Sequence, residues 1–289
     1  MKYPLLEITN DYVFKRVFGD SKDILLDFIK SVIVLQDNDK IEEIAILDPF
    51  IRGDYFDAKV GILDIKVKAR VKTKNNLLID IEMQVLNHKG FLKRIQFYLS
   101  KIFINEAKEG DNYEALPKAI SIIVTKFTLF NKGTKCFHRF RFYDPDDNLE
   151  FPTSNEIYTI ELPKFNKDKS HIDSRNWIRF INSTTEEEFM EAAQNSPFIE
   201  KAYAVLKKIS GDKVSRIQAE ARERALNNMA DLYASGKEDG IKEGTKIGEN
   251  KKNLEVVANM LKEGLSMELI SRYAGISLED AKKYAAQIQ

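Results

Sequence analysis

The chain is predicted to fold as an α/β protein, with a mixed β-sheet flanked by helices and followed by a helical C-terminal tail. Residues 61–84 alternate apolar and polar side chains with the period of two that β-strands show. Residues 119–125 form a continuous apolar run, which suits a central strand buried on both faces. Apolar residues recur at helical spacing in residues 7–36, in residues 88–108 and through most of the chain after residue 170. Helices therefore precede, interrupt and follow the strands.

The first 36 residues predict two helices rather than one. Phe14 and Phe18 lie one turn apart and are expected in the core. Ser21 follows a Gly-Asp break and can cap the second helix. Asp11 lies in the first turn, where an N-cap role is the simplest interpretation. Further strands are predicted at residues 41–48, 136–143 and 157–162.

Residues 61–84 predict an antiparallel hairpin whose short polar loop spans residues 72–76. Folding about this loop brings Asp64 level with Glu82 or Gln84 on one polar face, because successive strand side chains point to opposite faces. The hairpin thus gathers two acids and an amide. The ordinary alternative is a half-exposed hairpin whose polar face is solvated.

The chemical interpretation of this cluster is a metal site for phosphodiester hydrolysis. Mg²⁺ takes oxygen ligands, few of them from the protein and the remainder from water and phosphate. Asp64, Glu82 and the backbone carbonyl of Met83 would supply three. The metal would polarise a phosphate and lower the pKa of a bound water.

An Asp on one strand and Glu-x-(Lys or Gln) on the next resembles the PD-(D/E)XK nuclease superfamily. More narrowly, the chain resembles the Rpn family of recombination-promoting nucleases, which are also described as transposases. The resemblance spans nearly the whole chain and rests on six segments in order: Asn10–Lys15, Leu63–Asp64, Ile81–Gln84, Arg94–Tyr98, Glu161–Phe165 and the glycine-rich residues 236–248.

The resemblance implies a restriction-endonuclease-like fold and a metal-dependent DNA endonuclease linked to recombination or transposition. Its cofactor would be Mg²⁺ or another divalent cation, and its partner DNA. It implies support or DNA-binding roles for Arg94, Gln96 and Tyr98, of which Arg94 suits a bidentate phosphate contact best. It also leaves open a site role for Asp11, because related nucleases often bring an acid from the first helix.

The third motif position departs from the superfamily, because it holds Gln84 instead of Lys. Glutamine forms hydrogen bonds but carries no charge to stabilise a developing oxyanion. The Rpn resemblance implies that Gln is normal there. Lys66 or Lys68 on the neighbouring strand is a candidate for the missing charge; the alternative for both is an ordinary solvated strand face.

Charge is distributed unevenly although the formal net charge is zero. Residues 62–101 hold nine Lys or Arg against three acids, and residues 115–143 hold six and no acid. A basic surface around an acidic site suits a phosphate backbone, whereas lysines on strands also protect sheet edges. Two other functions therefore stay open: a degenerate nuclease that binds DNA without cutting it, and a protein-interaction module.

Cysteine content and hydropathy limit the other classes. The single cysteine, Cys136, excludes an intrachain disulfide and cysteine-cluster metal sites. No apolar run approaches the length of a membrane span, and the N-terminus lacks the apolar region of a signal peptide. The expectation is a cytoplasmic protein without membrane contact.

The predicted organisation is a nuclease-like domain at residues 1–195, a long helix with a glycine-rich segment at 196–250, and a small helical module at 251–289. Glycines recur every fourth residue from Gly236 to Gly248. This stripe favours a weak helix that another helix can approach closely, as in a homo-oligomer; the alternative is a flexible linker.

The last 37 residues predict three short helices with the spacing of a helix-turn-helix motif. The third helix opens with Glu279 and Asp280, where a recognition helix would contact base edges. Because acids there repel phosphate, self-association or partner binding is favoured over sequence-specific DNA binding.

Overall fold

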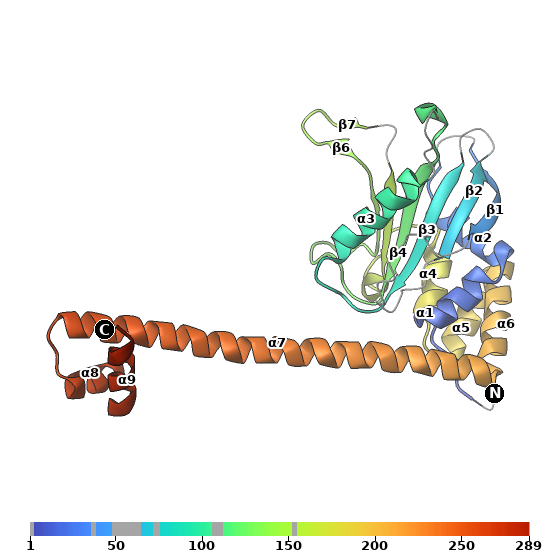
Figure 1. Ribbon diagram of the computed structural model, residues 1–289. Helices are drawn as coiled ribbons and strands as arrows, with labels where there is room; N and C mark the ends of the chain where they lie inside the picture. Colours follow the sequence, from blue (N-terminus) through green and yellow to red (C-terminus); the bar gives the residue numbers. More distant parts are fainter. Residues whose placement is uncertain are drawn as a thin grey trace. The chain divides into compact units, whose positions relative to one another are not determined.

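The computed structural model (Figure 1) describes residues 3–35, 39–47, 65–71, 76–105, 112–151 and 155–288. By their internal contacts they form two compact units, Met1–Leu226 and Asn227–Gln289. Each unit is described by itself. Among the described residues, no helix is both long enough and apolar enough to serve as a membrane span.

A six-stranded mixed sheet forms the centre of the first unit. Its order is β1-β2-β3-β4-β8-β5. Strands β1, β2 and β3 pair antiparallel, β3, β4 and β8 pair parallel, and β5 pairs antiparallel with β8. A separate two-stranded sheet joins β6 to β7. The strands are β1 (Ile41–Leu47), β2 (Ile65–Val71), β3 (Leu77–Gln84), β4 (Lys118–Thr125), β5 (Phe137–Phe140), β6 (Tyr143–Asp144), β7 (Leu149–Glu150) and β8 (Glu156–Glu161).

The sheet confirms the predicted α/β class, but strand β3 is more deeply buried than its alternation suggests. All eight residues of β3 are buried. Helix α3 (Phe91–Ile104) covers one face of β3 and β4, with Leu99 packing on Leu78 and Ala119 (Figure 1). The half-exposed hairpin with a solvated polar face is therefore wrong for β3, because a helix replaces solvent over its polar side chains.

The opposite face of the sheet packs on the helices that build the main core. This core contains alternate residues of β3 such as Ile79 and Ile81, together with Phe14, Phe18 and Trp177. The helices of this layer are α1 (Asp11–Phe14) with the π-helical turn η1 (Lys15–Gly19), α2 (Lys22–Val32), α4 (Arg175–Asn182), α5 (Glu186–Ala193) and α6 (Pro197–Gly211). Helix α6 follows the predicted boundary at residue 195 and supplies Ile199 and Leu206 to this core.

Helix ends follow local sequence signals, with two corrections. Asn10, rather than Asp11, is the N-cap of α1, and its side chain accepts hydrogen bonds from the backbone N–H groups of Tyr12 and Val13. Helix α3 begins at Phe91, three residues later than predicted, because Gly90 takes a left-handed conformation with φ of 86°. Thr185 forms a capping box with Glu188 at the start of α5.

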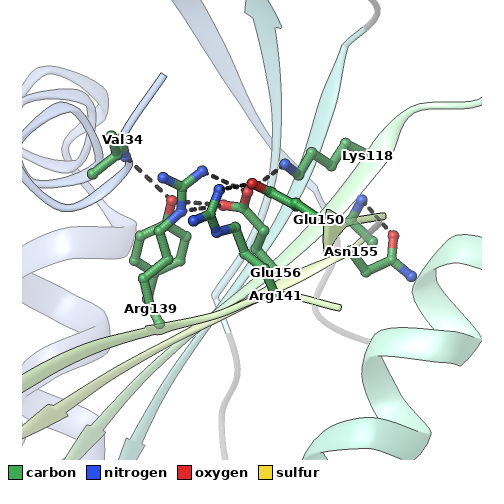
Figure 2. A network of polar contacts seen from close by, with 9 residues as sticks. Val34, Lys118, Arg139, Arg141, Glu150, Asn155 and Glu156 are labelled. Carbon is green, nitrogen blue, oxygen red and sulfur yellow. Dashed lines mark hydrogen bonds and ion pairs between the residues drawn. The ribbon is translucent and has the colours of Figure 1, made fainter. Parts of the chain in front are cut away.

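A buried ion-pair network closes the amino ends of β4 and β8 (Figure 2). Glu156 accepts hydrogen bonds from Lys118 at 2.6 Å, from Arg139 at 2.6 and 3.1 Å, and from the Tyr158 hydroxyl at 2.7 Å. Burial opposes ionisation of Glu156, but these partners outweigh it and lower the pKa of this carboxyl. The network fixes three neighbouring strands at the end opposite Gln84.

Helix α7 (Lys213–Lys262) contributes to both units. Within the second unit, the glycine stripe is helical, and a Cβ atom added at any of the four glycines would meet nothing within 4 Å. The last turns of α7 pack with α8 (Met267–Ala274) and α9 (Leu278–Ile288) around Val257 and Ile270. The first of the three predicted short helices is thus the end of α7.

Candidate active site at the carboxyl end of strand β3

Three polar side chains of β3 share the face that α3 covers. Asp80, Glu82 and Gln84 are spaced two residues apart and are 2%, 2% and 3% exposed. Across β4, Ser121 lies opposite Asp80 and Thr125 lies opposite Gln84. The row runs from the middle of the strand to its carboxyl end, where Gln84 is the last residue.

Helix α3 brings a cation onto this row. Arg94 Nη2 donates a hydrogen bond of 2.8 Å to Gln84 Oε1 and lies 3.8 Å from Glu82 Oε2. Its guanidinium carbon lies 5.2 Å from the centre of the Phe91 ring on the same helix. The Arg94 side chain is 29% exposed, so it reaches both the buried acid and the surface. Arg94 and the Glu82–Gln84 motif therefore form one cluster.

Short backbone contacts fix the orientation of Gln84. Its Nε2 atom donates to the carbonyl of Leu86 at 2.9 Å, which leaves Oε1 directed at Arg94. The carbonyl of Gln84 accepts from the backbone N–H of Lys126 at 3.0 Å. The Lys126 side chain pairs with Glu7, and this hydrogen bond is the main cause of a lowered pKa for the Glu7 carboxyl.

Other predicted site residues lie in different surroundings. Met83 points its side chain into the main core, so only its backbone carbonyl remains available to the site. Gln96 is exposed and lines a groove of about 430 Å³ with Phe140 and Phe142. Tyr98 is half-buried, with its ring 5.7 Å from that of Phe97. Within the described ranges, neither side chain forms a hydrogen bond with Glu82.

The two predicted lysines lie on the strand next to β3. Lys66 pairs in register with Asp80, and the half-buried Lys68 pairs with Leu78. Asp64 lies outside the described residues. The residue after it, Ile65, pairs with Ile81, the residue before Glu82.

Asp11 lies beside the first turns of helix α7, where it pairs with Arg222. Its Oδ2 atom lies 3.9 Å from Nε of Arg222, and the neighbouring Asn10 donates to the carbonyl of Ala219 at 2.9 Å. The Tyr12 hydroxyl donates to Ser215 Oγ at 3.4 Å. The polar residues of the Asn10–Lys15 segment thus anchor the start of α7 within the first unit.

A second buried polar cluster lies at the carboxyl end of β8. Glu161 Oε2 accepts from the backbone N–H groups of Leu129 and Phe130 at 2.7 and 3.0 Å, and Oε1 accepts from Lys164 Nζ at 3.0 Å. Lys164 Nζ also donates to the carbonyl of Phe130 at 2.6 Å. His138 Nδ1 lies 3.6 Å from Glu161, and burial is the main cause of the lowered pKa of His138. The Glu161–Phe165 motif therefore fixes the loop that follows β4.

Two residues, Asp80 in the row and Lys126 beside it, were absent from the predicted site set. Asp80 has the same parity along β3 as Glu82, a signal that was readable in the sequence. Lys126 directly follows β4 and reaches the site only through strand pairing, for which the sequence holds no signal.

The oxygen atoms of this cluster are ligands of the kind that a hard cation prefers. Glu82 offers carboxylate oxygens, Gln84 an amide oxygen and Met83 a carbonyl oxygen, which are the ligand types that Mg²⁺ prefers. Within the described ranges, no three His, Cys, Asp or Glu side chains gather into a metal cluster. Arg94 adds a permanent positive charge beside Glu82.

Comparison with known proteins yields a family match. The family model for PD-(D/E)XK nuclease family transposases matches residues 8–235, which include the whole sheet and the base of α7. No curated protein and no solved structure matches the chain significantly. Because the match covers well over half of the chain, the protein belongs to the PD-(D/E)XK nuclease family transposases.

Proposed function

We propose that the protein is a divalent-metal-dependent endonuclease that hydrolyses phosphodiester bonds of DNA, with a role in recombination or transposition. The observation that carries this proposal is the buried cluster of Glu82, Gln84 and Arg94 at the end of β3. The family supports a nuclease or transposase role, and the cluster supplies the charges that phosphoryl transfer requires.

Glu82, Asp64 and the backbone carbonyl of Met83 are proposed to hold the metal. The pairing of Ile65 with Ile81 supports Asp64 in this set, since it brings the two strands together next to both acids. When bound, Mg²⁺ would polarise the scissile phosphate and lower the pKa of the attacking water. Glu82 is held 3.8 Å from the Arg94 guanidinium, and Gln84 keeps that guanidinium in place.

DNA is proposed to approach the α3 side of the site, where basic residues are concentrated. The exposed Lys93 and the half-buried Lys101 lie on the same helix as Arg94. Phosphate contacts of this kind make affinity fall with rising salt. Lys66 and Lys68, on the strand beside β3, are proposed to support the same backbone path.

A homodimer through the C-terminal helices is proposed to align two active sites for cutting both strands. Helix α7 exposes several apolar side chains near its glycine stripe, with Leu232 and Tyr233 at 74% and 63% exposure. A helix with four glycines gains little stability alone, because each costs about 1 kcal/mol relative to alanine. A second copy that covers this face would supply the missing packing.

Plasmid nicking tests the proposal. Supercoiled DNA is incubated with the purified protein in Mg²⁺, Mn²⁺ or EDTA. Metal-dependent nicking supports the endonuclease. Binding without nicking would favour a degenerate nuclease that only binds DNA, and neither activity would favour an interaction protein.

A further inference from the structure

We infer that Arg94 supplies the catalytic positive charge that a motif lysine would otherwise provide, and that Gln84 is the residue that positions it. This inference rests on the proposed nuclease function. In this inference, Arg94 contacts the scissile phosphate rather than the neighbouring phosphates of the DNA backbone. Gln84 contributes only by orienting Arg94. The two residues lie on different elements, α3 and β3, and meet at 2.8 Å.

The first support is the placement of the guanidinium. Arg94 Nη2 contacts Gln84 Oε1 and lies 3.8 Å from Glu82 Oε2, so the charge lies beside the proposed metal ligand. A lysine at position 84 would bring a charge to the same carboxyl end of β3. Arg94 therefore fills, from the helix, a place that the chain's own glutamine cannot fill.

The second support is the unused hydrogen-bonding capacity of Arg94. A guanidinium carries five N–H groups in a planar fork. Its Nε atom is buried and has no hydrogen-bond partner among the described residues. A buried donor without a partner is costly, and a phosphate oxygen would satisfy it. The 29% exposure of the side chain leaves a path to substrate.

The third support is the fixed orientation of Gln84. Because Nε2 donates to the Leu86 carbonyl, the amide cannot rotate without losing that bond, and Oε1 stays turned to Arg94. This geometry makes Gln84 an acceptor for the cation rather than a donor to phosphate. Gln84 is thus a positioning residue.

In the reaction, the oxygen of water forms a bond to phosphorus and one phosphorus–ester oxygen bond breaks. The attacking water loses a proton to solvent and the departing alkoxide gains one, so the products are a phosphate monoester and an alcohol. Negative charge grows on the phosphate oxygens as the bonds exchange. Arg94 is placed to stabilise that charge through Nε and the guanidinium edge, as an electrostatic group fixed before the reaction.

Four variants test this assignment under single-turnover conditions: Arg94→Ala, Gln84→Ala, the double variant of both, and Gln84→Lys combined with Arg94→Ala. Removing Arg94 should lower the rate about 100-fold, as for other transition-state donors. Gln84→Ala alone should cost about 10-fold. It should cost nothing further once Arg94 is absent, because Gln84 acts only through it. Arg179→Ala is the charge-matched control, because Arg179 lies on α4, on the opposite face of the sheet, and its side chain forms an exposed ion pair with Glu191; this variant should stay within about twofold of wild type.

The lysine rescue carries a second readout. Gln84→Lys with Arg94→Ala should regain at least about tenfold over Arg94→Ala alone, since it returns one positive charge at the same end of β3. Its rate should fall at high pH as the lysine loses its proton, whereas the wild-type rate should not, because arginine stays charged.

DNA affinity in Ca²⁺ separates this role from a backbone clamp. Arg94→Ala should bind DNA within about threefold of wild type with the same salt slope. A large loss of affinity with a flatter slope would overturn the assignment, because that is the behaviour of a phosphate clamp. A wild-type rate for Arg94→Ala overturns this inference alone, whereas a wild-type chain that never cuts overturns the proposed function as well.

Discussion

The buried pair of Glu161 and Lys164 gives the most quantitative prediction for stability. Glu161 is fully buried, Lys164 is 8% exposed on its side chain, and together they hold the backbone of Leu129 and Phe130. Glu161→Gln keeps the size of the side chain but removes its charge. It leaves the Lys164 ammonium buried without its counter-ion, and breaking such a pair costs roughly 3–5 kcal/mol.

The assay is urea unfolding of the full chain. Free energies of unfolding are compared only between variants that show the same slope of free energy against urea concentration. The matched control is Glu150→Gln, which removes an exposed ion pair with Arg141 and should cost below about 1 kcal/mol. Combining Glu161→Gln with Lys164→Met should cost less than Glu161→Gln alone, because the amide oxygen can still accept from the backbone N–H groups of Leu129 and Phe130 and no charge is then stranded. A loss below about 1 kcal/mol for Glu161→Gln would refute this reasoning.

Three further predictions follow. Burial alone would raise the pKa of Asp168, but hydrogen bonds from Ser170 and the Cys136 amide outweigh it and lower this pKa from 3.8 to about 2. The free energy of unfolding should therefore fall as pH drops from about 4 to 2. In Asp168→Asn, the urea midpoint of unfolding should no longer show the part of this fall that Asp168 causes. A variant whose midpoint changes with pH as the wild type's does would contradict this assignment. Lys66→Ala should weaken binding to DNA of any sequence and flatten its salt dependence, and an unchanged slope of log affinity against log salt would place Lys66 outside the DNA path. The full chain should be dimeric by light scattering at tens of micromolar and a chain ending at Leu226 monomeric, so a monomeric full chain would refute the dimer.

The strands were predictable because alternation and apolar runs report directly on strand faces. The run at residues 119–125 is the buried central strand β4, and the alternation in β3 correctly places Glu82 and Gln84 on one face. The alternation does not indicate whether solvent or another element of the fold covers that face. Helix α3 does so, and its position depends on packing of residues such as Leu99, so the burial of Glu82 had no local signal.

Contacts between distant elements were the other part that sequence could not supply. Arg94 was predicted as a support residue through the family resemblance, but its bond to Gln84 depends on how α3 is rotated over the sheet. The Glu161–Phe165 segment was recognised only as a motif, although its acid and lysine hold a loop. Asn10 rather than Asp11 caps α1, because side chains one residue apart compete for the same backbone donors.

The measurement that tests the central claim most directly is plasmid nicking by the wild type and by Glu82→Gln, both in Mg²⁺ and in EDTA. The substitution keeps the shape of the side chain and removes its charge, and circular dichroism checks that the fold is retained. The wild type should nick in Mg²⁺ and not in EDTA, while Glu82→Gln should lose most of this activity. Equal metal-dependent rates for the two proteins would contradict the assignment of the site to Glu82.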